Sequence, residues 1–308
     1  MGRNYLKCLF TGLLVLFITL NSFESFSQFE RIEQVSSFYS RIDNPVTIEV
    51  TSHQERIRFT AVNKSPFPYE IEIEFSTLQN LLPRITSKKF IIDQGRTQLF
   101  ELKRQYSHLG IDFRYHLRTQ IGNPGILPDT IFPYLIPLVP DREISFIGVE
   151  RWDTVKIVRN AFSIEPGEPV LNMRKGKVTA VQSAKAPGTF FYQERVSHLS
   201  IVEVLHRDGT IAIYDGIDQA FLFVKTGDIV YPGQQLGLAD EGSMITVRLY
   251  HLEKGGMLRY LDMHFAINEK ESVLFNDLID KKINHPATVI EREMNRRERR
   301  LFRSGSLY

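Results

Sequence analysis

Four histidines are the side chains of this sequence best suited to bind a metal or to move a proton: His198, His206, His251 and His264. A catalytic zinc site needs three protein ligands, usually His and carboxylate, and an open position for water. No two of these histidines form an H-x-H or H-x-x-x-H pair, the spacings that bring two imidazoles to one metal. We therefore expect structural or surface roles for them, and we leave open a cluster assembled from different strands.

Other catalytic arrangements are missing from the sequence. No G-x-S-x-G segment occurs, and the glycine-rich residues 227–237 lack both the G-K-[ST] ending and the following helix of a phosphate-binding loop. Asp240 and Glu241 fall in a predicted loop, where we expect solvated carboxylates. Cys8 is the only cysteine and lies in a predicted leader, so the mature chain has no disulfide, no thiolate zinc ligand and no cysteine nucleophile.

The most informative motif is V-x-x-G-D-x-V-x-x-G-Q-x-x-G at residues 224–237, whose glycines suit tight turns between short strands. Upstream come G-E-P-V at 167–170, G-K-V at 176–178, H-R-D-G at 206–209 and Y-D-G at 214–216. In this order the pieces resemble the lysostaphin/LytM-like family of zinc metallopeptidases, which cut peptidoglycan cross-links. The resemblance covers about residues 162–265.

The resemblance also implies where the zinc site would be. It places Arg159 and Ser163 at the family's H-x-x-x-D ligands, Gly216 at its Y-x-H histidine, and Thr246 and Arg248 at its closing H-x-H. A guanidinium has no lone pair for a metal. We therefore expect a degenerate member with no catalytic residues, no metal and no cofactor. These five positions would form a groove in which the arginines suit an anionic, carboxylate-bearing ligand.

The expected function is that of a non-catalytic binding or regulatory module, with an envelope protein or a peptidoglycan peptide as partner. One alternative is an active zinc endopeptidase with atypical ligands: shifting the last strand by three residues brings His251 to the second histidine position but leaves Leu249 at the first. Another alternative is a structural subunit of an envelope assembly. A formal charge of only +2 over 308 residues argues against a nucleic-acid partner.

Residues 1–27 have the features of a secretory signal peptide. Arg3 and Lys7 precede an apolar run at 9–20, and Ser25 and Ser27 form a small-x-small cleavage pattern. Cys8 precedes the run, whereas a lipoprotein cysteine would follow it. We expect an exported protein in the periplasm or cell envelope of a bacterium. A membrane contact would come only through an uncleaved signal or the basic C-terminal tail.

Alternating apolar and polar residues predict an all-β protein of about two domains. Residues 28–140 are predicted to form an antiparallel, Ig-like β-sandwich; at 70–75 three glutamates alternate with three apolar side chains. The prolines at 132–140 indicate a segment that is extended at a sheet edge or forms a stiff connector, followed by a linker at 141–161. The degenerate LytM-like domain is expected at 162–268. A charged helical tail at 269–308 is expected to be solvated or, alternatively, to contact an anionic partner or lipid surface.

Overall fold

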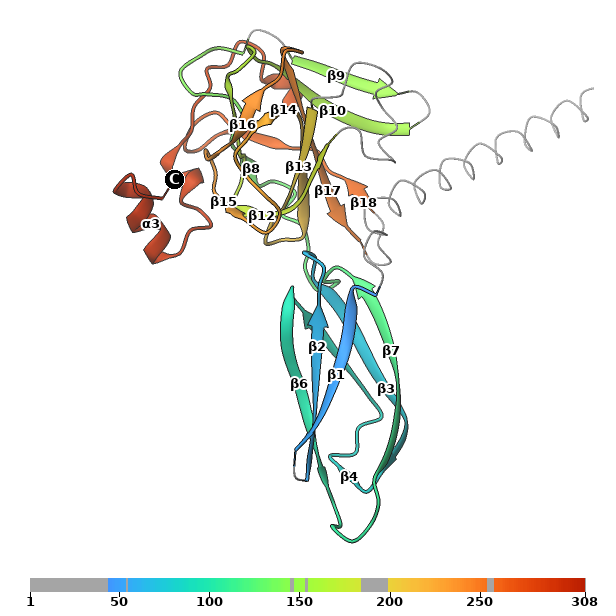
Figure 1. The fold of residues 1–308 in the computed structure, drawn as a ribbon. Helices are drawn as coiled ribbons and strands as arrows, with labels where there is room; N and C mark the ends of the chain where they lie inside the picture. The colour runs from blue at the N-terminus through green and yellow to red at the C-terminus, as the bar shows by residue number, and fades with distance from the viewer. Residues whose placement is uncertain are drawn as a thin grey trace, which may run out of the picture.

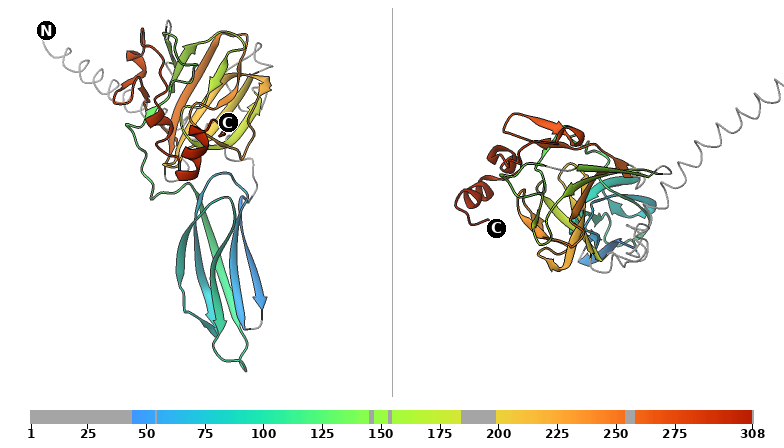
Figure 2. Two further views of the ribbon diagram at one scale, coloured as in Figure 1. Left: turned by 90° about the vertical axis from the view of Figure 1, so that its left-hand side faces the viewer. Right: turned by 90° about the horizontal axis from the view of Figure 1, so that it is seen from above.

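The computed structural model describes residues 44–53, 55–144, 147–152, 155–183, 199–253 and 258–307. The predicted leader at 1–27 lies outside them. An elongated β-sandwich stands below a broader β domain, and the short C-terminal helices lie to one side of the latter (Figures 1 and 2). The prediction of an all-β protein is confirmed. Within the described ranges, no helix is long and apolar enough to cross a membrane.

The N-terminal domain is the predicted sandwich. One sheet has the order β1-β2-β6-β4 and the other the order β5-β3-β7. Its strands are β1 (Val46–His53), β2 (Arg56–Asn63), β3 (Tyr69–Gln79), β4 (Leu81–Leu82), β5 (Ser87–Ile92), β6 (Gly95–Arg104) and β7 (Asp112–Ile121). Ile71 and Ile73 of β3 are fully buried between the sheets, whereas Glu72 and Glu74 lie outside and pair with Arg118 of β7. Alternation along β3 therefore separates the core from a charged surface.

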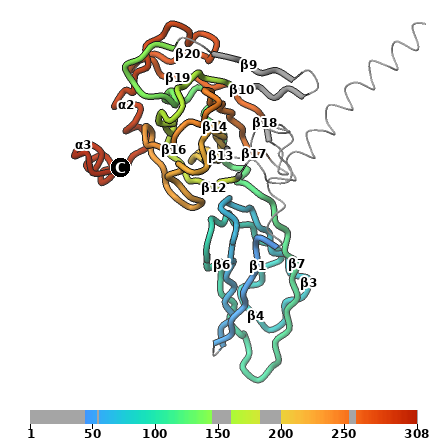
Figure 3. Tube along the Cα trace, turned by 45° about the horizontal axis from the view of Figure 1, so that its top comes forward, coloured from blue at the N-terminus to red at the C-terminus, as the bar shows by residue number. Residues whose placement is uncertain are grey.

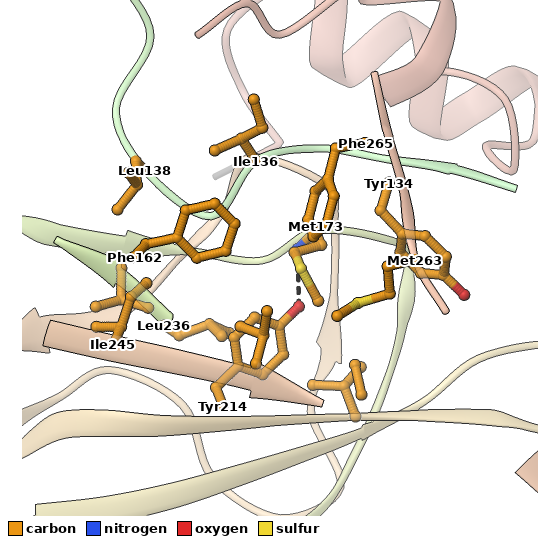
Figure 4. Packing of buried hydrophobic residues seen from close by; sticks show 14 of the residues in the cluster. Tyr134, Ile136, Leu138, Phe162, Met173, Tyr214, Leu236, Ile245, Met263 and Phe265 are labelled. Atoms are coloured by element: carbon orange, nitrogen blue, oxygen red, sulfur yellow. Dashed lines mark hydrogen bonds between the residues drawn. The ribbon is translucent and has the colours of Figure 1, made fainter. Parts of the chain in front are cut away.

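The second domain is built on a ten-stranded sheet with the main order β15-β12-β13-β14-β17-β10-β9; β11, β16 and β18 pair at its margins. The strands are β9 (Ile147–Trp152), β10 (Val155–Ser163), β11 (Pro169–Leu171), β12 (Gly176–Ser183), β13 (Leu199–Leu205), β14 (Thr210–Leu222), β15 (Ile229–Val230), β16 (Gln235–Ala239), β17 (Met244–Leu252) and β18 (Leu258–Tyr260). Phe162, Tyr214, Ile245 and Phe265 pack in its core, where the Tyr214 hydroxyl accepts a hydrogen bond from the Met173 backbone at 2.8 Å (Figure 4).

The proline-containing segment after the sandwich belongs to the second domain. β8 (Pro133–Tyr134) pairs in parallel with β19 (His264–Ala266), which also pairs with β20 (Ser272–Leu274). Phe132, Ile136 and Leu138 enter the core of the second domain. The segment expected as a linker, 141–161, contains β9 and most of β10, so it is part of the sheet. Two or three apolar residues separate successive prolines, and this pattern allows the segment to be extended and buried at once.

The C-terminal segment packs on the side of the second domain (Figure 3). It contains a 3-10 turn (Phe275–Asp277), α2 (Ala287–Ile290) and α3 (Arg296–Arg303). Val289, Ile290 and Met294 are buried against Leu135 and Ala266. Asn295 caps α3: its side chain accepts from the backbone of Arg297 and Glu298, and Glu298 returns a bond to the Asn295 backbone. The tail is therefore docked on the domain through these buried residues.

Both domains contribute to one apolar cluster at their junction. Phe67 and Ile92 of the sandwich belong to the same buried cluster as Ile201, Ile211 and Leu252 of the second domain. The side chains of Lys177 and Gln94 form a hydrogen bond across the same boundary. Apolar burial of this kind fixes the orientation of two domains more firmly than a flexible linker does.

Candidate functional site

The positions of the predicted groove lie on three adjacent strands, β10, β14 and β17. In the register, Ala161 of β10 and Asp215 of β14 both lie opposite Thr246 of β17, and Ile213 lies opposite Arg248. Side chains directly opposite one another project from the same face of a sheet. Thr246 and Arg248 therefore share the face opposite the core side chains of β17. We refer to this surface as the outer face.

Thr246 and Arg248 are buried but incompletely bonded. Each is 8% exposed, and neither the Thr246 Oγ1 atom nor the Arg248 Nε atom has a hydrogen-bond partner. Within the described part of the chain, no carboxylate pairs with Arg248. Buried polar atoms are bonded in the large majority of cases, so two unbonded ones two residues apart on a single face are unusual. Both atoms therefore keep an unused capacity for a hydrogen bond.

The other predicted groove residues are placed less favourably for a ligand. Ser163 is half-buried and lies opposite Met244, and its carbonyl oxygen accepts a 3.0 Å hydrogen bond from Arg142. Arg159 belongs to β10, where it pairs with Glu150 of β9; its side chain is outside the description. The register thus brings Thr246 and Arg248 together and leaves Ser163 at the end of the strand.

Gly216 occupies a bulge between β14 and β13 with a φ of +101°. A Cβ atom at this position would lie 2.5 Å from the carbonyl oxygen of Met244. Any side chain, including the histidine of the LytM-like pattern, would require the backbone to move. Glycine is therefore needed here for the close approach of β14 to β17.

A buried acid lies on the same face, two strands from Arg248. Glu203 of β13 is opposite Ile213, and its carboxylate accepts a hydrogen bond from the Thr179 hydroxyl. Burial raises the pKa of Glu203 to about 7, although the Thr179 hydrogen bond acts in the opposite direction. Strand spacing puts the Cα atoms of Glu203 and Arg248 roughly 10 Å apart.

The histidines do not assemble a metal site in the described part of the chain. No group of three or more His, Cys, Asp or Glu side chains there is close enough to hold a metal ion. His206 and His251 line one cavity of about 580 Å³ between the domains, whereas His264 lies on β19 and His198 is outside the description.

His206 Nδ1 donates to the Lys175 carbonyl at 3.0 Å. Burial, followed by the nearby charge of Arg174, lowers the pKa of His206 to about 3, so its ring is neutral.

A buried ionic network that the motifs did not indicate surrounds Arg174. Its guanidinium is 2% exposed, bonds Asp208 at 2.9 Å, and bonds Glu293 through two nitrogens at 2.7 and 3.0 Å. The guanidinium also stacks on Phe132, 3.7 Å from the ring centroid. Burial raises the pKa of Asp208, but Arg174 and the hydrogen bond from Thr210 outweigh this effect, and the pKa falls to about 2. Every charge in this network is paired, so we assign it a structural role.

The order of strands and turns follows the motif order of the sequence. The G-E-P-V segment leads into β11, G-K-V opens β12, the H-R-D-G turn joins β13 to β14, and the G-D and G-Q steps precede β15 and β16. Gly176 shows why one of these glycines is needed, because a Cβ there would lie 2.7 Å from the Leu205 carbonyl oxygen.

No family model and no curated protein matches the sequence. Among solved structures, the catalytic domain of the prophage-encoded M23 protein EnpA from Enterococcus faecalis is 18% identical and has a TM-score of 0.28; the match covers 42% of this chain and 93% of that one. Csd3 from Helicobacter pylori is 11% identical, with 86% and 75% covered and a TM-score of 0.29. A zinc-containing peptidase from Vibrio cholerae is 11% identical, with 75% and 90% covered and a TM-score of 0.29. Similarity at this level does not decide activity, ligands or partners.

Proposed function

We propose that this chain is a non-catalytic cell-envelope protein whose second domain binds a carboxylate, carried by a peptidoglycan peptide or by a partner protein, on the outer face of β17. One observation carries the proposal: Arg248 is buried on that face with an unbonded Nε atom, beside the unbonded hydroxyl of Thr246. Both residues stand where the LytM-like pattern has its H-x-H metal ligands.

The chemistry of these two side chains fits a carboxylate. A guanidinium offers parallel N–H groups that match the two oxygens of a carboxylate, and a hydroxyl can donate a third hydrogen bond. Positions 246 and 248 are roughly 7 Å apart along the strand, within reach of one ligand group and its neighbour. Removing a buried charge from water without a counter-ion is costly, and a bound carboxylate would offset that cost.

The donor set at these positions does not suit catalytic zinc. The two histidines of the LytM-like H-x-H pattern are replaced by the hydroxyl of Thr246 and the guanidinium of Arg248. A histidine at position 216 would collide with the Met244 carbonyl oxygen. The domain would then recognise the carboxylate of its ligand. By this binding it would regulate a cell-wall enzyme or anchor an envelope complex. If the protein were instead a structural subunit of an envelope assembly, the outer face would bind no ligand.

The test is direct binding of a synthetic peptidoglycan stem peptide to the chain lacking residues 1–27. We expect binding of the peptide with a free terminal carboxylate, a loss of roughly tenfold or more in Arg248→Ala, and no binding of the peptide amide. Arg259→Ala is the matched control, because Arg259 lies on the neighbouring strand opposite His251 and thus on the other face. A pull-down from envelope extracts with the same variants tests a protein partner.

Two results would overturn the proposal. Arg248→Ala together with Arg159→Ala could leave every peptide and protein interaction unchanged, which would exclude the outer face. Alternatively, metal analysis of the purified protein could find stoichiometric zinc together with release of peptidoglycan fragments, which would establish a peptidase.

A further inference from the structure

The C-terminal segment 287–307 contains six arginines and three glutamates, and all three carboxylates are bonded to other side chains. Glu293 bonds Arg174, and Glu298 accepts from Lys175 Nζ at 2.7 Å and from the Tyr231 hydroxyl at 3.1 Å. Glu291 binds Arg303 through two hydrogen bonds of 2.6 and 2.7 Å. Glu293 and Glu298 therefore neutralise residues outside the segment, and Glu291 neutralises Arg303 alone.

The arginines of α3 gather on one side of the helix. Positions 296, 299, 300 and 303 follow the i, i+3, i+4, i+7 spacing of a single helical face, and position 297 lies at its margin. Arg296, Arg297 and Arg300 are exposed and form no ion pair within the described ranges. The opposite side carries Glu298 and the partly buried Phe302, which pack on the domain. We call Arg296, Arg297, Arg299, Arg300 and Arg303 the arginine face.

The first two of these arginines do not serve the stability of the helix, whereas Arg300 and Arg303 lie in its last turn, where positive charge is favourable. Arg296 and Arg297 are the first two residues of α3, where the helix dipole favours acidic side chains and basic ones are unfavourable. The helix instead depends on the Asn295–Glu298 capping box and on the ion pair between Glu298 and Lys175. The domain thus holds a cluster of positive charge in a fixed position at its side (Figures 1 and 2).

We propose that the arginine face is a docking surface for an anionic phospholipid bilayer. Guanidinium groups bind phosphate oxygens through paired N–H donors, and basic residues attract proteins to anionic membranes by charge alone. A protein partner would require an apolar centre in the patch. None of the large apolar side chains exposed in the described structure belongs to residues 287–307. A surface that is strongly basic without an apolar anchor fits a layer of headgroups.

Co-sedimentation with vesicles tests the proposal. The chain lacking residues 1–27 is used, because the predicted leader would itself bind lipid. We expect binding to phosphatidylcholine vesicles that contain phosphatidylglycerol, no binding to phosphatidylcholine alone, and release at high salt. Arg296→Gln, Arg297→Gln and Arg300→Gln combined should weaken binding roughly tenfold or more.

The matched control removes three positive charges elsewhere, by Arg84→Gln, Lys88→Gln and Lys89→Gln on the exposed side of the sandwich, and should leave vesicle binding unchanged. Thermal unfolding shows whether both triple variants fold as the parent chain does. Equal binding by the parent and the α3 variant would overturn the proposal. So would binding of soluble poly-glutamate, but not of vesicles, since that result would assign the face to an acidic polypeptide.

Discussion

Arg248 has opposite effects on the stability of the free protein and on the proposed binding of a carboxylate. A buried guanidinium with an unbonded nitrogen destabilises the free protein, and the same group would contribute most to capturing a carboxylate.

Replacing Arg248 by methionine separates these two effects. We expect Arg248→Met to raise the free energy of unfolding by about 1–3 kcal/mol, because an apolar side chain of similar length removes an unsatisfied buried charge. Urea denaturation measures the change, and the binding assay should show a simultaneous loss of peptide affinity. A clear fall in stability would mean that Arg248 has a structural partner.

Glu203 should make stability depend on pH near neutrality. Its folded-state pKa of about 7 lies above the ordinary value of 4.5, so the folded protein holds a proton that the unfolded chain releases. This contribution is complete below about pH 4.5 and is lost as the pH rises through 7, a difference of roughly 3 kcal/mol. The stability of the parent chain relative to that of Glu203→Gln should therefore decline from pH 4.5 to pH 8. The opposite contribution of His206, whose pKa is lowered to about 3, is common to both chains and cancels in this difference.

Gly216 should tolerate no side chain. Gly216→Ala combines a positive φ with a contact of 2.5 Å to a carbonyl oxygen, so a loss of about 2 kcal/mol or more is expected. Thermal unfolding measures it, and Gly227→Ala, where no atom lies within 4 Å of the added Cβ, separates the contact from the cost of φ alone. Equal losses in both variants would show that the Met244 contact is harmless.

At the scale of elements, four side chains attach the C-terminal segment: Arg174 and Lys175 before β12, and Glu293 and Glu298 near α3. Glu293→Gln would leave Arg174 buried with Asp208 as its only carboxylate, and removing one member of a buried pair typically costs about 3–5 kcal/mol. Hydrogen exchange should show faster exchange across 287–307 in this variant. Glu291→Gln, which breaks an exposed pair with Arg303, should change exchange little.

The features that could be predicted from the sequence are the strands and turns that depend on residues close together in the chain. Alternation at 70–75 and the Asp-Gly turn at 208–209 were sufficient to predict β3 and the hairpin of β13 and β14, and both are present. The Arg174 network could not be predicted, because Arg174 meets Asp208 across 34 positions and Glu293 across 119. The burial of residues 132–138 was missed for a related reason: prolines indicate an extended chain, but not what covers it.

At the scale of the whole molecule, the shared apolar cluster couples the two domains. We expect a single cooperative unfolding transition in calorimetry, because Phe67 and Ile92 are buried against Ile201, Ile211 and Leu252. Phe67→Ala should lower stability by about 3–5 kcal/mol and separate the transition into two. Two transitions already present in the parent chain would show that the junction does not couple the domains.

The distance in sequence between Arg174 and Glu293 also sets the timing of folding. Until the last residues of the chain are available, the centre of the second domain holds a cation without its bidentate partner, and the surface around Leu135 is uncovered. The domain therefore cannot reach its final state while the chain is still being made from its N-terminus.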